Sequence, residues 1–184
     1  MSFRENSLGR RLALQYLFGL DYTGYDWQGG LASFWEMDPL RLSRESLEAG
    51  EEPVFAADAA NISKAKARAY AERLIEGACA NEAEILERIA SVLDNWTPDR
   101  VGRVEMSVLR VAMSEMLYGR GVPAAVIISE AVNLAKEFGP EEAPRFVNGV
   151  LDRLRKTLES EDFATPPPRA IPEEDAEHPR EDDE

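Results

Sequence analysis

Arginine and aromatic side chains lie close together near the start of the chain, a combination suited to binding nucleic acid. Arg4, Arg10 and Arg11 precede Tyr16 and Phe18. Guanidinium groups hold the phosphate backbone, and aromatic rings stack on unpaired bases. On composition alone, a solvated helix start followed by core aromatics is the simpler interpretation. This segment is therefore a candidate phosphate-binding arm.

A second basic and aromatic group flanks the turn formed by Gly139-Pro140. Lys136 and Phe138 precede this turn, and Arg145 and Phe146 follow it. Two interpretations remain open. The phenylalanines belong to the core with ordinary surface charges around them, or the turn continues the surface begun by the N-terminal arm.

Glu105 and Arg110 are charged residues within an otherwise apolar stretch. Their spacing of five residues does not favour a direct ion pair within one helix. Ion pairs with other helices and a contact to a protein partner explain the pair equally well.

The sequence gives little support to catalysis. It contains no phosphate-binding loop, no dinucleotide-binding glycine motif and no metalloprotease motif. A single cysteine, Cys79, excludes a disulfide framework and a multi-cysteine metal site, and a single histidine, His178, offers no nucleophile–base pair. We therefore expect a binding protein with no catalytic residue, no metal and no cofactor.

The chain carries 21 basic and 35 acidic residues, a net charge of −14, but the acidity is concentrated in two segments. Residues 161–184 contribute −8 and residues 38–60 contribute −4, whereas residues 1–20 are +2. Charges more than about 10 Å apart are largely screened. An acidic tail can therefore coexist with a local basic patch. The absence of a signal-like or membrane-spanning apolar run predicts a soluble, cytoplasmic protein.

Hydrophobic residues recur at helical spacing outside these acidic segments. About seven helices and no credible strand are expected, which predicts an all-α bundle. We expect a short helix over 31–37, after glycines that punctuate the chain. We expect a central buried helix that starts at Thr97-Pro98-Asp99 and ends at Gly119.

The last helix contains Asn148-Gly149, a pair typical of hairpin turns. The row formed by Phe146, Val150 and Leu154 has helical spacing instead, so we place Gly149 inside a helix. Its cost of about 1 kcal/mol against alanine is tolerable if another helix packs closely there. Glu141 and Glu142 are expected in the first turn of this helix.

The chain divides into a helical domain over 1–158 and a tail over 159–184. The tail is proline-rich and acidic, so we expect it to be disordered. Within the domain, residues 38–60 form an acidic connector, with a possible short helix near 41–48.

Four strings in this order resemble the NusB family of transcription antitermination factors. They are RRLALQYLF (10–18), VEMSVLRVAMSEM (104–116), VPAAVIISEAVNLAKEFG (122–139) and RFVNGVLDRL (145–154). The resemblance covers roughly 7–157 apart from the connector. It implies an all-α fold of two packed three-helix-type subdomains.

The resemblance also implies a function. NusB proteins bind the boxA element of ribosomal RNA leader transcripts together with NusE, a small-subunit ribosomal protein. The complex joins the RNA polymerase elongation machinery and suppresses premature termination. With the basic residues noted above, the predicted RNA-binding set is Arg4, Arg10, Arg11, Lys136, Phe138, Glu142, Arg145 and Phe146. The resemblance places Phe18 and Glu105 on the NusE side.

Two other interpretations stay open. NusB-like domains also occur as the RNA-binding part of certain ribosomal RNA cytosine methyltransferases, so the chain could be a detached domain of that kind. It could also be a homodimer that masks its own RNA face. Phosphate contacts weaken with salt, and we expect measurable RNA affinity chiefly when NusE is present.

Overall fold

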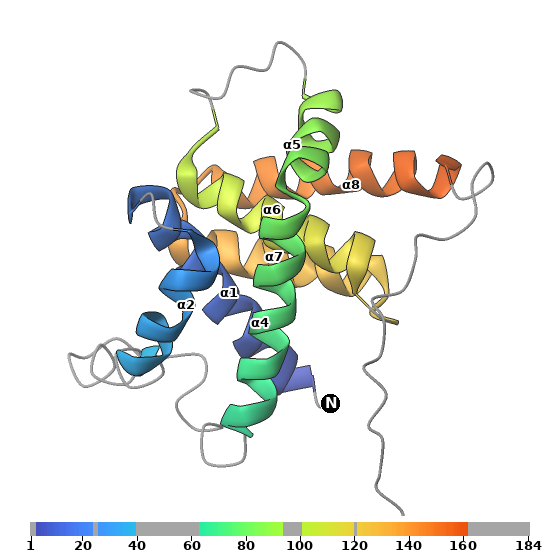
Figure 1. Cartoon of the computed structure of the whole chain (residues 1–184). Helices are drawn as coiled ribbons and strands as arrows, with labels where there is room; N and C mark the ends of the chain where they lie inside the picture. Colours follow the sequence, from blue (N-terminus) through green and yellow to red (C-terminus); the bar gives the residue numbers. More distant parts are fainter. Residues whose placement is uncertain (1–2, 24–25, 40–62, 94–100, 120, 162–184) are drawn as a thin grey trace, which may run out of the picture.

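The structure is a computed structural model that describes residues 3–23, 26–39, 63–93, 101–119 and 121–161. These residues form seven helices and no strand, which confirms the predicted all-α fold. The helices are α1 (Phe3–Thr23), α2 (Trp27–Glu36), α4 (Lys64–Ala80), α5 (Glu82–Ser91), α6 (Arg103–Tyr118), α7 (Ala124–Phe138) and α8 (Ala143–Glu161) (Figure 1).

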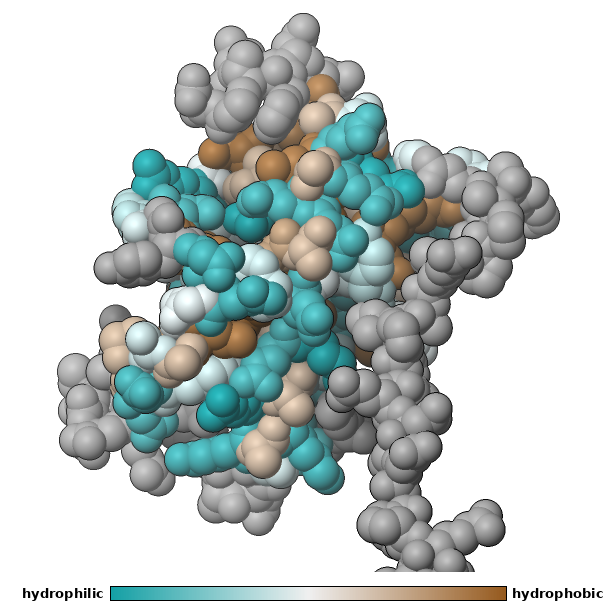
Figure 2. Space-filling model, in the orientation of Figure 1, coloured by the Kyte–Doolittle hydropathy of each residue, from teal (hydrophilic) through white to brown (hydrophobic). Residues whose placement is uncertain are grey.

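The helices pack as two groups around α6. Helices α1, α2 and α4 form one group, and α6, α7 and α8 form the other, with α5 contacting α4, α6 and α8 (Figure 1). Helix α6 also packs against both α1 and α4. Nine consecutive α6 residues, from Ser107 to Glu115, are buried, as expected for a central helix. The view in Figure 2 shows a mostly hydrophilic surface around α4, with small apolar areas scattered across it.

Helices α1 and α4 approach each other closely at Gly9. A Cβ atom there would lie 2.9 Å from the Ala67 carbonyl oxygen and 2.8 Å from the Tyr70 ring. Glycine therefore lets α1 and α4 pack backbone to backbone. Gly149 lies inside α8 as predicted, but the expected close packing is wrong, because a Cβ atom there would meet nothing within 4 Å.

Two helix starts differ from the sequence-based expectation. Helix α2 begins at Trp27 and includes the glycines expected to interrupt the chain, because the Asp26 side chain caps it by accepting from the Gly29 N–H at 3.3 Å. Helix α6 begins at Arg103, since the extended backbone of Gly102 precedes it. The predicted start at 97–99 lies outside the described residues and does not cap this helix.

The bounds of α8 also correct the prediction. The helix begins at Ala143, so Glu141 and Glu142 precede its first turn. It runs to Glu161 and therefore crosses the boundary predicted after residue 158. The possible helix near 41–48 and the tail from residue 162 lie outside the described residues.

None of the helices described above is both long and apolar enough to span a membrane.

Candidate nucleic-acid interface

The first helix meets the end of α7 through Arg11. The Arg11 guanidinium lies over the Phe138 ring, 5.2 Å from its centroid, and forms an ion pair with Glu137. Arg4 lies two turns earlier on α1 and is exposed. The structure thus joins the two basic and aromatic groups that the sequence placed far apart. We use the name junction surface for the predicted residues on α1 and around the turn between α7 and α8, apart from Arg10: Arg4, Arg11, Lys136, Phe138, Glu142, Arg145 and Phe146.

A tight turn holds the α7 and α8 parts of this surface together. Gly139 ends α7, and its N–H donates to the Ala135 carbonyl oxygen at 2.9 Å. A Cβ atom on Gly139 would lie 2.7 Å from the Cβ of Ala143, so only glycine lets the two helix ends come this close. Phe138 precedes this turn and Phe146 follows it, and both rings pack against the same core.

Both predicted interpretations of these phenylalanines apply in part. Phe138 and Phe146 are half-buried and pack against the core, whereas Lys136, Glu142 and Arg145 are exposed. Each ring is therefore held by the core on one side and remains partly accessible to solvent. Such a surface offers cations for phosphates and ring faces for bases.

The electrostatics of Arg11 favour an anion at this surface. Burial lowers the pKa of Arg11 from its ordinary value, because desolvation disfavours the charged form. An anion next to the guanidinium offsets that desolvation. In the structure Glu137 supplies one such anion.

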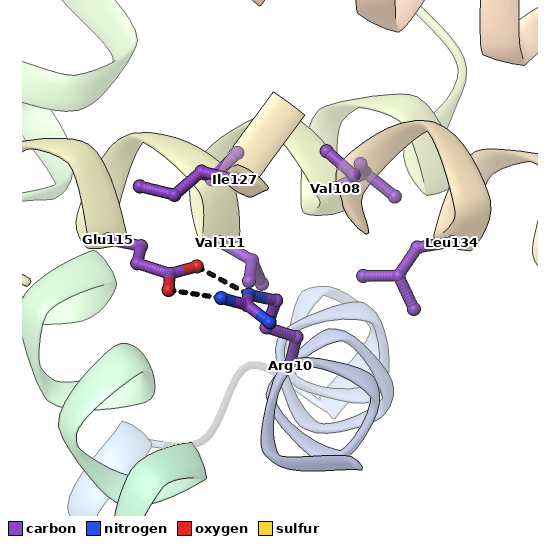
Figure 3. A pocket seen from close by; sticks show the side chains of 8 residues that line it. Arg10, Val108, Val111, Glu115, Ile127 and Leu134 are labelled. Atoms are coloured by element: carbon purple, nitrogen blue, oxygen red, sulfur yellow. Dashed lines mark hydrogen bonds and ion pairs between the residues drawn. The ribbon is translucent and has the colours of Figure 1, made fainter. Parts of the chain in front are cut away.

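Arg10 does not belong to the junction surface. Its side chain is 2% exposed, and its Nε and Nη2 atoms each donate to a Glu115 oxygen at 2.6 Å (Figure 3). Its Nη1 donates to Glu130 at 3.2 Å. This position leaves the guanidinium no surface for a phosphate, so we revise its predicted role from an RNA contact to a positioning residue.

The Arg10 cluster ties four helices together. Arg10 and Ser7 belong to α1, Tyr70 to α4, Glu115 to α6 and Glu130 to α7. The Tyr70 and Ser7 hydroxyls donate to Glu115 and Glu130. A network that spans so many elements fixes where the first turns of α1 sit, and therefore where Arg11 lies.

The cluster also controls protonation. Burial by itself would lower the pKa of Arg10, but the hydrogen bonds and charge of Glu115, with Tyr70 and Glu130 nearby, raise it above its ordinary value. Burial and the bond to Glu115 raise the pKa of Tyr70 well above that of a free tyrosine. Arg10 is therefore cationic and Tyr70 neutral at physiological pH.

The space beside this cluster is not a ligand site. Apolar side chains from α6 and α7 surround the Arg10–Glu115 pair, including Val111, Ile127 and Leu134 (Figure 3). The gap between them has no room for a water-sized molecule. The buried charges therefore serve packing and orientation.

The predicted partner residues lie at the other end of α1. Phe18 is half-buried and meets Tyr22 edge to face, with ring centroids 5.3 Å apart. Tyr22 is 62% exposed, and Arg103 at the start of α6 lies 4.4 Å from its ring centroid. Glu105, in the first turn of α6, is half-buried and folds back toward Gly102. An aromatic and charged surface thus connects Phe18 with Glu105.

Tyr22 and Arg103 did not feature among the sequence-based candidates. Tyr22 follows Phe18 by one helical turn, and this spacing could have revealed it. Arg103 had no such signal, because its contact with Tyr22 joins residues far apart in the sequence.

Arg110 is an interior residue, which resolves one open alternative. Its guanidinium lies 3.1 Å from Asp21 and 2.8 Å from Glu82, on two other helices.

Cys79 is half-buried, and burial raises the pKa of its thiol to about 11. A thiol with that pKa is protonated at neutral pH, as expected for a small packed side chain.

The comparisons with known proteins agree with the fold and with the sequence motifs. The NusB family profile matches residues 8–156. The transcription antitermination protein NusB of Geobacter sulfurreducens is 36% identical over 151 residues, which cover 82% of this chain and 94% of the relative. The protein of the same name from Nitratidesulfovibrio vulgaris is 34% identical over 82% of this chain and 87% of the relative.

Solved structures of NusB proteins are also similar to this chain. NusB from T. maritima superposes with a TM-score of 0.62 at 29% identity and covers 85% of this chain and 93% of its own. The NusB chain in a crystal structure of antitermination factors NusB and NusE with double-stranded RNA has a TM-score of 0.61 at 26% identity, covering 85% and 99%. These relatives are antitermination proteins, and the match covers most of their own length. This result does not favour a detached methyltransferase domain. The chain belongs to the NusB family.

Proposed function

We propose that this chain is a non-catalytic transcription antitermination factor that binds boxA-type RNA together with NusE and joins the RNA polymerase elongation complex. The observation that carries the proposal is the stacking of Arg11 on Phe138 where α1 meets α7, in a chain of the NusB family. The solved complex of a relative with NusE and RNA supports the same assignment.

The junction surface is the proposed RNA site. Arg4, Arg11, Lys136 and Arg145 supply positive charge, and the half-buried rings of Phe138 and Phe146 offer faces for unpaired bases. Glu142 is exposed on the turn between these groups and limits the positive potential there. Arg10 holds α1 in place beneath this surface.

The surface around Phe18 and Glu105 is the proposed NusE site. Tyr22 and Arg103 extend it, because they lie exposed or stacked between the two predicted residues. Arg11 and Phe18 are seven positions apart on α1, a rise of about 10 Å along the helix. RNA and NusE therefore bind near enough to contact each other on one rigid helix, which favours linked binding.

Two substitutions test the two sites separately. Reversing the charge of Arg11 with Glu should weaken the gel shift of boxA RNA in the presence of NusE, while leaving NusE affinity unchanged. Glu105→Lys should weaken NusE binding measured by calorimetry. An RNA shift unaffected by Arg11→Glu would remove Arg11 from the RNA site, and an unchanged NusE dissociation constant would remove Glu105 from the partner site.

A further inference from the structure

Glu137 lies against the same guanidinium that the proposed function assigns to RNA. Its carboxylate forms an ion pair with Arg11, and both side chains remain partly accessible, with 36% of the Glu137 side chain and 19% of the Arg11 side chain exposed. The pair is thus open to a competing anion from solvent.

Helix stability does not explain a glutamate at this position. Glu137 is in the last turn of α7, one residue before the helix ends at Phe138. The C-terminal end of a helix carries partial negative charge, so an acidic side chain there is unfavourable and a basic one, such as Lys136, is favourable. The contact that offsets this cost is the ion pair with Arg11.

The position of Arg11 leaves the edge of its guanidinium, which carries the N–H donors, as the place where an anion can bind. One face of the guanidinium is covered by Phe138, so an anion is bound along the edge that carries the N–H donors. A carboxylate and a phosphate use that edge in the same way. Glu137 and an RNA phosphate therefore require the same donors.

We propose that Glu137 is an intramolecular competitor of the RNA backbone: its carboxylate occupies the Arg11 edge in the free protein, and a phosphate has to displace it. This inference rests on the proposed function. It makes Glu137 a residue that sets RNA affinity without contacting RNA. Because a partly exposed ion pair is weak, the competition should reduce affinity only about two- to five-fold.

A double-mutant cycle tests the inference, with fluorescence anisotropy of labelled boxA-type RNA in the presence of NusE at low salt. Glu137→Gln should raise RNA affinity about two- to five-fold. The same change in an Arg11→Gln background should give no such gain, because the masked group is gone. Glu141→Gln is the matched control, since Glu141 is exposed nearby and its replacement removes the same charge.

Each other outcome has a definite meaning. An equal gain from Glu137→Gln with and without Arg11, or a gain matched by Glu141→Gln, would show a general charge effect and overturn the competition. Unchanged or weaker binding by Glu137→Gln would also overturn it and indicate that Glu137 orients Arg11. Unchanged binding by Arg11→Gln alone would instead contradict the proposed RNA role of Arg11. Urea unfolding of each variant, with Arg11→Lys as a charge-preserving alternative, separates these effects from loss of folding.

Discussion

Arg10 of α1 and Glu115 of α6 form a bidentate ion pair in the interior, with both N–O distances 2.6 Å and both side chains almost completely buried. Glu130 of α7 takes a third donor of the same guanidinium. The pair thus links the two groups of helices and sets the position of the helix that carries Arg11. It provides a structural reason for an arginine that was predicted to contact RNA.

Removing the cation should strongly destabilise the fold. Arg10→Met leaves Glu115 and Glu130 buried without a compensating charge, and breaking a buried pair in this way costs about 3–5 kcal/mol. Urea unfolding measures the free energy. Arg145→Met, which removes an exposed arginine, should cost less than about 0.5 kcal/mol. Equal stability of the two variants would contradict the assigned role of Arg10.

Two glycines should respond to alanine in opposite directions. Gly149→Ala adds a methyl group in open space on α8 and should stabilise the protein by about 1 kcal/mol, since alanine is the better helix former. Gly9→Ala would press a methyl group against Ala67 and Tyr70, so α1 and α4 would have to separate. The expected result is a higher melting temperature for the first variant and a lower one for the second. Changes of the same sign would contradict this packing.

Alkaline pH should weaken the fold through two tyrosines. Burial and a hydrogen bond to Glu84 raise the pKa of Tyr118 to about 12, and burial with Glu115 also raises that of Tyr70. The folded state thus favours the protonated phenol over the unfolded state, whose pKa is about 10. The contribution of Tyr118 to the free energy of unfolding is complete below about pH 10 and is lost as the pH rises from 10 to 12.

The tyrosine contribution can be measured by urea unfolding at a series of alkaline pH values. Tyr118→Phe keeps the ring but cannot ionise, so its stability should fall less steeply between pH 10 and 12 than that of the parent protein. Identical profiles for the two proteins would show that Tyr118 ionisation is not coupled to folding.

The salt dependence of RNA binding should distinguish Lys136 from Lys156. Both are exposed lysines, but Lys136 lies on the junction surface and Lys156 pairs with Asp152 far along α8. Losing one phosphate contact reduces the slope of log affinity against log salt by about 0.7 for single-stranded RNA. Lys136→Gln should show this reduction and Lys156→Gln should not. Equal slopes would remove Lys136 from the RNA site.

The helices and their order were predictable because they follow from the local spacing of hydrophobic residues and from the glycines and prolines that end helices. The end of α7 at Gly139 and the central position of α6 are examples. Helix starts were less predictable where side-chain capping decided them. Asp26 caps the start of α2, which then includes two glycines. The extended backbone of Gly102 precedes α6, so this helix begins only at Arg103.

The candidate site was predictable in its residue types but not in its burial. Arg10 and Arg11 are adjacent and chemically identical, yet one is in the interior and the other stacks on Phe138. Only the partners Glu115 and Glu130, more than 100 residues away, decide which is buried. In the same way, the close helix approach occurs at Gly9 rather than Gly149, which depends on where α4 lies.

The central claim is that the N-terminal half of α1 binds RNA while its C-terminal end binds NusE. The most direct test is to measure boxA RNA affinity by fluorescence anisotropy with and without saturating NusE. NusE should raise RNA affinity, and RNA should raise NusE affinity by the same factor. Failure of the protein to bind either ligand, alone or together, would contradict it.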